Sequence, residues 1–297
     1  MKPVNIGIIG LGTVGCGVVN VLHRNAEEIS RRAGRRIVVT HGVVRDIGRL
    51  RACHTDAFSM TTDPNEVTDH PDIDIVVELI GGLKTSREVV QRSLTNGKHV
   101  VTANKDVMAK YGPEILEAAN SNGVRVLFEA TVAGGTPIIA PLQRDLLANE
   151  VIAVNGIING TTNYILTRMA RDGIDFMDAL TEAQELGYAE PDPTNDVEGI
   201  DAAYKLAILA SIAFQTPVFD SDVYREGISK LTSRDFVYAS ELGYTIKLIG
   251  VARRDAEGIR ARVHPAFISS DVMIAKVDGV LNAIEIETDL AGPVFFH

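Results

Sequence analysis

The segment Val4–Gly15 reads Val-Asn-Ile-Gly-Ile-Ile-Gly-Leu-Gly-Thr-Val-Gly and decides the class of fold. An apolar run of strand length, Val4–Ile9, leads into a Gly-x-Gly-x-x-Gly pattern that opens a helix reaching about Arg32. In this strand–turn–helix context the pattern indicates a dinucleotide site, because the glycines let the backbone approach a pyrophosphate and the helix N-terminus supplies unpaired N–H groups. The alternative is a strand–helix turn that binds nothing. We predict that the nicotinamide cofactor is bound by Gly10, Gly12, Thr13, Val14 and Gly15.

The same alternation of apolar runs and helical periodicity continues to about residue 130. One expected helix has Ser86 as its cap and ends at Gly97, and another has Pro113 in its first turn and ends at Gly123. Strands that alternate with helices predict a mostly parallel sheet, so the expected class is α/β with a Rossmann-type doubly wound sheet. The further expected strands are Ile37–Val44, Ile73–Ile80, His99–Ala103 and Val124–Phe128.

The pattern changes after Glu129. The segment Ala133–Pro137, Ala-Gly-Gly-Thr-Pro, interrupts regular structure and predicts a domain boundary, with one domain over residues 1–132 and a second over 133–297. The second half mixes helices and strands without strict alternation and predicts an α+β domain. Its expected elements are the helices Pro137–Leu147, Thr161–Arg171 and Asp175–Leu186, a long apolar helix after residue 199, and the strands Val151–Ile158, Tyr244–Ala252 and Ile259–Phe267.

Composition narrows the functional class. The chain has 297 residues, with 29 Lys+Arg against 39 Asp+Glu and a net charge of −10. This excess of acid repels polyphosphates and anionic lipids, so we expect neither a nucleic-acid nor a membrane partner. Two cysteines, Cys16 and Cys53, are too few for a disulfide framework, and the first residues lack a signal-peptide pattern. We therefore expect a cytoplasmic location, and the unpaired spacing of the seven histidines argues against a zinc site.

The residues after the second expected strand bear on the choice of cofactor. Arg45 could pair with the 2′-phosphate of NADP, whereas an acidic residue at this place would bind the ribose hydroxyls of NAD. Asp46 stands beside Arg45, and a solvated loop arginine is nearly as plausible. NADP is favoured and NAD remains possible.

Two segments of the sequence carry candidate catalytic residues. Between Gly199 and Phe214 only Asp201 and Lys205 are formally charged, in a helix that is apolar on nearly every face. A surface ion pair fits such a helix poorly, so we predict that one of its turns faces a wet cleft and points both groups at a substrate. Lys105 follows an apolar run at the carboxyl end of an expected parallel strand, the edge at which doubly wound sheets bind ligands.

With these residues assembled, the chain closely resembles homoserine dehydrogenase over almost its whole length. The family signature Ala-x3-Gly-aromatic-small…Pro-x2-Asp-x2-Gly-x-Asp-x3-Lys is matched between Ala183 and Lys205. Further matching blocks are Val77–Gly82, Val101–Lys105, Phe128–Ile138 and Asn159–Tyr164.

The resemblance implies NAD(P)-dependent interconversion of L-homoserine and L-aspartate 4-semialdehyde, in the pathway to threonine, methionine and isoleucine. By motif position, Lys205 would donate a proton to the carbonyl oxygen during reduction, and Asp201 would orient the substrate or a bridging water. Glu190 would grip the amino group of homoserine, and Gly187 falls where the family contacts cofactor and substrate. Lys105 would be the lysine between nicotinamide and substrate.

The resemblance also implies an alkali cation such as sodium, held largely by backbone oxygens, and a homodimer formed through the sheet of the second domain. The matching cation positions are Glu129, Val132, Gly134 and Thr136. Family members continue past the point where this chain ends, at Gly292–His297, with a segment that returns to the nucleotide domain and often an ACT domain. We therefore expect a truncated form in which cofactor affinity is in question.

Two other hypotheses stay open at this point. A Rossmann-type oxidoreductase for a different small carbonyl would share the fold, because fold does not fix substrate. A non-catalytic NADP-binding or interaction subunit, inactivated by loss of the C-terminal segment, would keep the glycine-rich turn without turnover.

Overall fold

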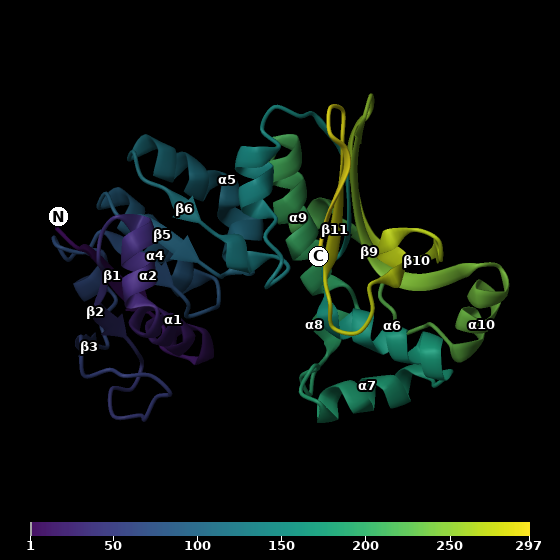
Figure 1. The fold of residues 1–297 in the computed structure, drawn as a ribbon, viewed down its shortest axis with the longest axis horizontal. Helices are drawn as coiled ribbons and strands as arrows, with labels where there is room; N and C mark the ends of the chain where they lie inside the picture. The colour runs from purple at the N-terminus through teal and green to yellow at the C-terminus, as the bar shows by residue number, and fades with distance from the viewer. Residues whose placement is uncertain (1) are drawn as a thin grey trace. The chain divides into compact units, whose positions relative to one another are not determined.

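The computed structural model describes residues 2–297. The chain divides into two compact units, Met1–Thr131 and Val132–His297. Each unit has its own sheet (Figure 1), and the two are treated separately below.

Unit 1 alternates strands and helices. Its strands are β1 (Val4–Ile9), β2 (Ile37–Val43), β3 (Ser59–Thr61), β4 (Ile75–Glu78), β5 (His99–Thr102) and β6 (Val126–Leu127). Its helices are α1 (Thr13–Arg24), α2 (Ala26–Ala33), α3 (Asn65–Thr68), α4 (Lys84–Thr95), α5 (Lys105–Ser121) and the short η1 (Glu129–Thr131).

The sheet of unit 1 has the order β3-β2-β1-β4-β5-β6, and all of its pairs are parallel. This is the doubly wound order of dinucleotide-binding folds, so the predicted fold class is confirmed. Side chains of β1 alternate between two apolar clusters, because successive residues of a strand point to opposite faces. Ile8 packs with Val19 of α1, and Ile9 packs with Val67 of α3 and Val89 of α4.

Strand β3 and helix α3 were not predicted, and three expected details of unit 1 are wrong. The first helix ends at Arg24, and α2 begins after Asn25, whose φ of −105° and ψ of 20° break the helical path. Ser86 lies inside α4, where its hydroxyl donates to buried Glu78 at 2.9 Å instead of capping the helix. Pro113 lies in the middle of α5, because the side chain of Asn104 caps that helix eight residues earlier than expected, accepting from the Val107 amide at 3.1 Å.

Unit 2 combines a mixed sheet with helices. Its strands are β7 (Val151–Ile157), β8 (Tyr224–Arg225), β9 (Tyr244–Asp255), β10 (Gly258–Ser269), β11 (Ala283–Thr288) and β12 (Gly292–Phe296). Its helices are α6 (Gly160–Asp172), α7 (Phe176–Glu185), α8 (Thr194–Val197), α9 (Ile200–Phe214), α10 (Ser233–Glu241) and the short η2 (Pro141–Asp145), η3 (Asp220–Asp222) and η4 (Met273–Lys276).

The second sheet has the order β12-β11-β7-β9-β10-β8, antiparallel except that β8 runs parallel to β10. Helix α9 packs on β7, β9 and β10. The approach is close at Gly250, where a Cβ would lie 3.4 Å from a methyl group of Leu206. The expected α+β character is confirmed, whereas β11 and β12 were not predicted. The helix expected over Pro137–Leu147 is mainly the single π turn of η2.

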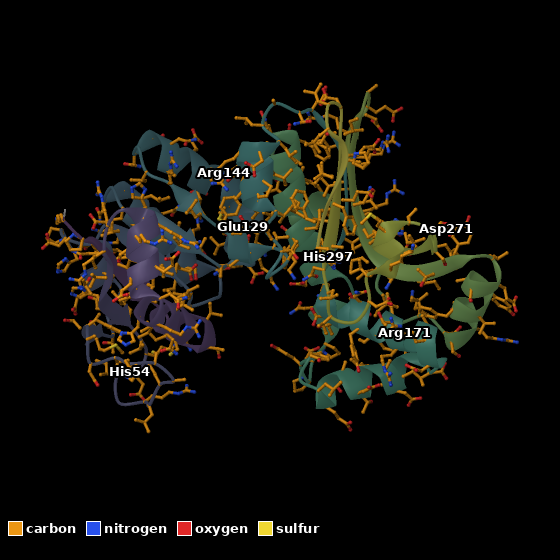
Figure 2. All side chains as sticks on the ribbon, in the orientation of Figure 1. His54, Glu129, Arg144, Arg171, Asp271 and His297 are labelled. Carbon is orange, nitrogen blue, oxygen red and sulfur yellow. The ribbon has the colours of Figure 1, made fainter. Side chains whose placement is uncertain are left out.

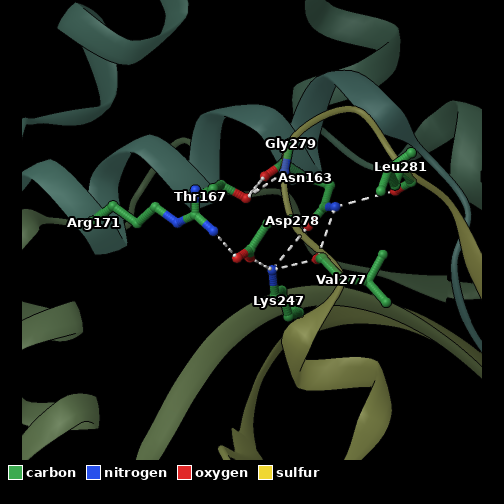
Figure 3. A network of polar contacts seen from close by, with 8 residues as sticks. All are labelled: Asn163, Thr167, Arg171, Lys247, Val277, Asp278, Gly279 and Leu281. Carbon is green, nitrogen blue, oxygen red and sulfur yellow. Dashed lines mark hydrogen bonds and ion pairs between the residues drawn. The ribbon is translucent and has the colours of Figure 1, made fainter.

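A buried lysine ties the segment before β11 to α6 (Figure 3). Lys247 of β9 donates to the carbonyl oxygen of Val277 at 2.7 Å, to Oδ1 of Asn163 at 3.2 Å and to the carboxylate of Asp278 at 2.8 Å. Arg171, which projects from α6 (Figure 2), contacts the same carboxylate at 2.6 Å. The segment lies so near the start of α6 that a Cβ on Gly160 would come within 2.7 Å of a backbone oxygen.

Candidate functional site

The glycine-rich turn of unit 1 is shaped by two glycines that the fold itself requires. Gly10 has a φ of +106°, and a Cβ there would lie 2.7 Å from the backbone of Leu79. A Cβ on Gly15 would lie 2.0 Å from the carbonyl oxygen of Gly10. Strand and helix can therefore meet this closely only with glycine at both positions.

Gly12 is different, because neither its backbone conformation nor any contact within residues 2–297 requires a glycine there. Its φ is −81°, which any residue adopts, and a Cβ there would meet no atom within 4 Å. Gly12 is the N-cap of α1 without a side-chain cap, and the following residues, Thr13 and Val14, are exposed. A glycine beside open space at an uncapped helix N-terminus fits the close approach of a pyrophosphate. The residues present thus fit a dinucleotide.

The loop after β2 carries the residues that bear on cofactor choice. Arg45 is exposed, whereas the side chain of Asp46 accepts the Gly48 amide at 2.9 Å. The carboxylate of Asp46 is thus engaged in a local turn. The exposed guanidinium of Arg45 is a group that can pair with a phosphate, while the Asp46 carboxylate can still accept further hydrogen bonds.

The carboxyl ends of β4 and β5 are joined by a buried glutamate that sequence reasoning missed. Glu78 is fully buried and accepts from Ser86 at 2.9 Å, from the hydroxyl of Thr102 at 2.6 Å and from the Ile80 amide at 3.0 Å. These bonds fix the loop ends that precede Lys105, the first residue of α5.

In unit 2, the Asp201–Lys205 pair of α9 is formed. Lys205 Nζ lies 2.6 Å from Asp201 Oδ2, with side-chain exposures of 18% and 4%. Burying two charges costs several kcal/mol per ion unless further hydrogen bonds compensate. Those bonds are present, because Lys205 Nζ donates to the carbonyl oxygen of Ile158 at 3.1 Å and Asp201 accepts from the Asn159 side chain at 2.9 Å. The pair is therefore nearly buried and fixed by hydrogen bonds to its neighbours, unlike a solvated surface pair.

The loop that carries Gly187 and Glu190 is tied to the start of α6. Thr161 donates from its hydroxyl to the carbonyl oxygen of Tyr188 at 2.7 Å, and the rings of Tyr188 and Tyr164 lie 5.0 Å apart. Gly187 has a φ of +75°, and the side chain of Glu190 is exposed. The structure thus attaches this loop to the same helix terminus whose preceding residue, Asn159, contacts Asp201.

Burial raises the pKa of Tyr164 beneath this loop, and a hydrogen bond to Glu182 raises it further. The same bond, at 2.8 Å, is the main cause of a lowered pKa for Glu182, which Arg168 also contacts. Opposite shifts on the two partners are what a phenol donating to a carboxylate produces. This cluster anchors α7 on α6 just before the loop.

The segment expected to hold a cation runs from η1 through a tight turn. Ala133 and Gly135 have φ values of 45° and 92°, and the Thr136 amide donates to the Ala133 carbonyl at 2.8 Å. Backbone and hydroxyl oxygens are hard ligands, the type that alkali and alkaline-earth cations take. Within residues 2–297 no cluster of three or more His, Cys, Asp or Glu side chains could hold a metal, which does not bear on a site built from backbone oxygens.

Comparison with known proteins agrees with this geometry. The model of the homoserine dehydrogenase NAD-binding domain matches residues 10–129, and the homoserine dehydrogenase model matches residues 137–297. The chain belongs to the homoserine dehydrogenase family. It is therefore an oxidoreductase of the class that acts on a CH–OH group, with a nicotinamide-nucleotide-binding domain, and the resemblance identified from its motifs is confirmed.

Relatives and solved structures give the extent of the match. The homoserine dehydrogenase of Pseudomonas aeruginosa is 54% identical over 297 residues, which are all of this chain and 68% of that protein, and the Bacillus subtilis enzyme is 40% identical. The crystal structure of a homoserine dehydrogenase from Thiobacillus denitrificans superposes with a TM-score of 0.95 at 55% identity, covering 99% of this chain and 68% of that one. A hyperthermophilic archaeal homoserine dehydrogenase in complex with NADPH gives a TM-score of 0.82 at 28% identity, covering 99% and 91%.

Residues 2–297 contain no helix that is both long and apolar enough to cross a membrane.

Proposed function

We propose that this member of the family interconverts L-homoserine and L-aspartate 4-semialdehyde, with Lys205 as the proton donor and Asp201 as its partner. The single observation that carries the assignment of roles is the ion pair of 2.6 Å between the only two formally charged side chains of α9. The bound nicotinamide supplies or accepts the hydride.

Lys205 supplies what the reacting oxygen needs. Reduction of an aldehyde leaves negative charge on its oxygen, which an ammonium group can stabilise and protonate. Asp201 contacts that ammonium at 2.6 Å and so holds it in one place. In the reverse direction the same amine accepts the proton of the hydroxyl group.

Substrate recognition is assigned to the loop tied to α6. Glu190 provides a carboxylate for the α-amino group of homoserine, and Gly187 allows close approach of backbone to ligand because it carries no side chain. The ammonium group of Lys105 would lie between the nicotinamide and the substrate.

The cofactor is proposed to be NADP, with NAD as the less favoured alternative. Gly10, Gly12, Thr13, Val14 and Gly15 would hold the pyrophosphate at the start of α1. The exposed Arg45 after β2 would pair with the 2′-phosphate.

An alkali cation such as sodium is proposed for the oxygens of Glu129, Val132, Gly134 and Thr136, and the turn with positive φ at Ala133 and Gly135 lies within this segment. A homodimer is proposed through the sheet face that carries Val251, Asn155 and Glu285, whose side chains are only half-buried.

The proposed location of the protein is the cytoplasm. Its reaction would belong to the pathway to threonine, methionine and isoleucine.

The test is NADPH oxidation by the purified chain with L-aspartate 4-semialdehyde and with other small aldehydes. Preference for the semialdehyde supports the proposal, and equal rates would favour an oxidoreductase for another carbonyl. Lys205→Ala should lower kcat by about 10²–10⁴-fold, the usual contribution of a positioned acid. Lys230→Ala, at an exposed lysine of the same unit, is the matched control. A parent chain that binds NADPH but turns over no faster than Lys205→Ala would instead be a binding subunit.

A further inference from the structure

The side chain of Asn159 contacts two carboxylates, those of Asp196 and Asp201. Asn159 lies two residues after the end of β7, is 5% exposed, and forms the N-cap of α6. Its side-chain nitrogen, Nδ2, donates to Asp196 Oδ1 at 2.7 Å and to Asp201 Oδ2 at 2.9 Å. One amide group therefore uses both of its N–H bonds on two different carboxylates.

The orientation of this amide is dictated by the chain. Asn159 Oδ1 accepts the backbone N–H of Thr162 at 2.9 Å, and a backbone N–H can only donate. The oxygen of the amide must therefore face α6, and the NH₂ group must face Asp196 and Asp201. The hydrogen-bonding capacity of the side chain is filled, and its rotation is fixed by the cap.

The same short stretch of backbone addresses both members of the Asp201–Lys205 pair. The carbonyl oxygen of Ile158 accepts from Lys205 Nζ at 3.1 Å, and the next side chain, Asn159, donates to Asp201. Asp201 Oδ2 receives both the Lys205 ammonium at 2.6 Å and the Asn159 amide at 2.9 Å. The junction of β7 and α6 thus sets where the carboxylate lies and where the ammonium lies.

We infer that Asn159 is a positioning residue of the reaction: its amide holds Asp201 in register with Lys205 and links that pair to Asp196 on α8. Because it acts through Asp201, this inference rests on the proposed role of Lys205. The Asn159 amide is a neutral donor that binds two carboxylates without adding charge. A lysine or arginine at the same place would add a positive charge. A misplacement of about 1 Å at such a pair can lower a rate by roughly 10²-fold.

The experiment separates capping from positioning with two variants. Asn159→Ser keeps an oxygen that can cap α6 but is too short to reach both carboxylates, whereas Asn159→Ala removes cap and donors together. Positioning predicts a fall in kcat of about 10²-fold for both variants, with the dissociation constant for NADPH unchanged. Capping alone predicts that Asn159→Ser behaves as the parent chain and that only Asn159→Ala loses activity, and that result would overturn the inference.

A double-mutant cycle supplies the readout that a purely structural role would not move. In the Asp201→Ala background, Asn159→Ser should lower kcat by less than about twofold, because the carboxylate that Asn159 orients is gone. An undiminished loss in that background refutes positioning. Thr232→Ala removes the hydrogen bond of 2.8 Å from the Thr232 hydroxyl to Asp235 at the N-terminus of α10, and so controls for loss of a side-chain bond at another helix N-terminus. Lys205→Ala is measured alongside: if it keeps full activity the proposed role of Lys205 fails, whereas an inactive Lys205→Ala with a fully active Asn159→Ser refutes only the role of Asn159.

Discussion

Removing one or the other partner of the Lys247–Asp278 pair should destabilise unit 2 unequally. The Lys247 side chain is 2% exposed, while that of Asp278 is 32% exposed and keeps Arg171 as a second cation. Burial lowers the pKa of Lys247, which Asp278 partly offsets. Burial acts to raise the pKa of Asp278, but Lys247 and Arg171 outweigh it and the net pKa is lowered.

The magnitudes follow from which groups are left without partners. Asp278→Ala leaves a buried ammonium with only neutral acceptors, and an uncompensated buried charge costs about 3 kcal/mol or more. Lys247→Met leaves Asp278 paired with Arg171 and the Val277 carbonyl bonded to the Asn163 amide at 3.1 Å. Of the three acceptors that lose the ammonium, only Asn163 Oδ1 has no other donor among the hydrogen bonds of residues 2–297. Relief of the lysine's desolvation offsets part of that loss, so we expect about 1 kcal/mol.

Hydrogen exchange followed by mass spectrometry measures this locally, which matters because a chain of two units need not unfold in one step. The amide of Gly279, which donates to the Thr167 hydroxyl at 3.1 Å, lies in the segment concerned. Asp278→Ala should lower the free energy of opening of this segment and of β9 by about 2 kcal/mol more than Lys247→Met does. Equal losses, or a greater loss for Lys247→Met, would refute the reasoning.

Three further outcomes are expected. Hydrogen bonds from Arg92 are the main cause of a pKa of about 2 for Asp69, below the ordinary 3.8, so the stabilising effect of Asp69 is present above pH 3.8 and is lost as the pH falls towards 2. An NMR titration of the Asp69 carboxyl group should give a midpoint near 2, and Arg92→Gln should return that midpoint towards 3.8. Burial and a bond with the neighbouring thiol raise the pKa of Cys53 to about 11, so iodoacetamide at about pH 8 should label it far more slowly than an unfolded cysteine, and equal rates would contradict the geometry. Gly12→Ala should fold normally, because its Cβ meets only open space, yet it should bind NADPH at least about tenfold more weakly; normal NADPH affinity would remove the argument for a pyrophosphate there. Gly15→Ala should instead be destabilised, because its Cβ would lie 2.0 Å from a backbone oxygen.

Much of unit 1 could be predicted because its signals are local. The apolar run Val4–Ile9 with the glycines after it specifies strand, turn and helix over a dozen residues. The errors have local causes as well. Pro113 favours a helix start, yet Asn104 caps the same helix earlier, and the helix continues through the proline to Ser121.

The Asp201–Lys205 pair could be found from sequence because two charges stand out in an apolar helix four residues apart. The supporting residues could not. Asn159 is 37 and 42 positions from its two carboxylate partners, and no periodicity connects residues on different elements. The two cysteines, 37 positions apart, likewise lie with their sulfur atoms 2.9 Å from each other although no spacing rule pairs them.

The central claim is that the ammonium of Lys205 meets the reacting oxygen, and a crystal structure with NADP and L-homoserine tests it most directly. The account predicts that the substrate hydroxyl lies within hydrogen-bond reach of Lys205 Nζ, about 2.6–3.2 Å, while Asp201 keeps its contact with the same nitrogen. A substrate bound elsewhere, with Lys205 still paired only to Asp201 and the Ile158 carbonyl, would contradict it.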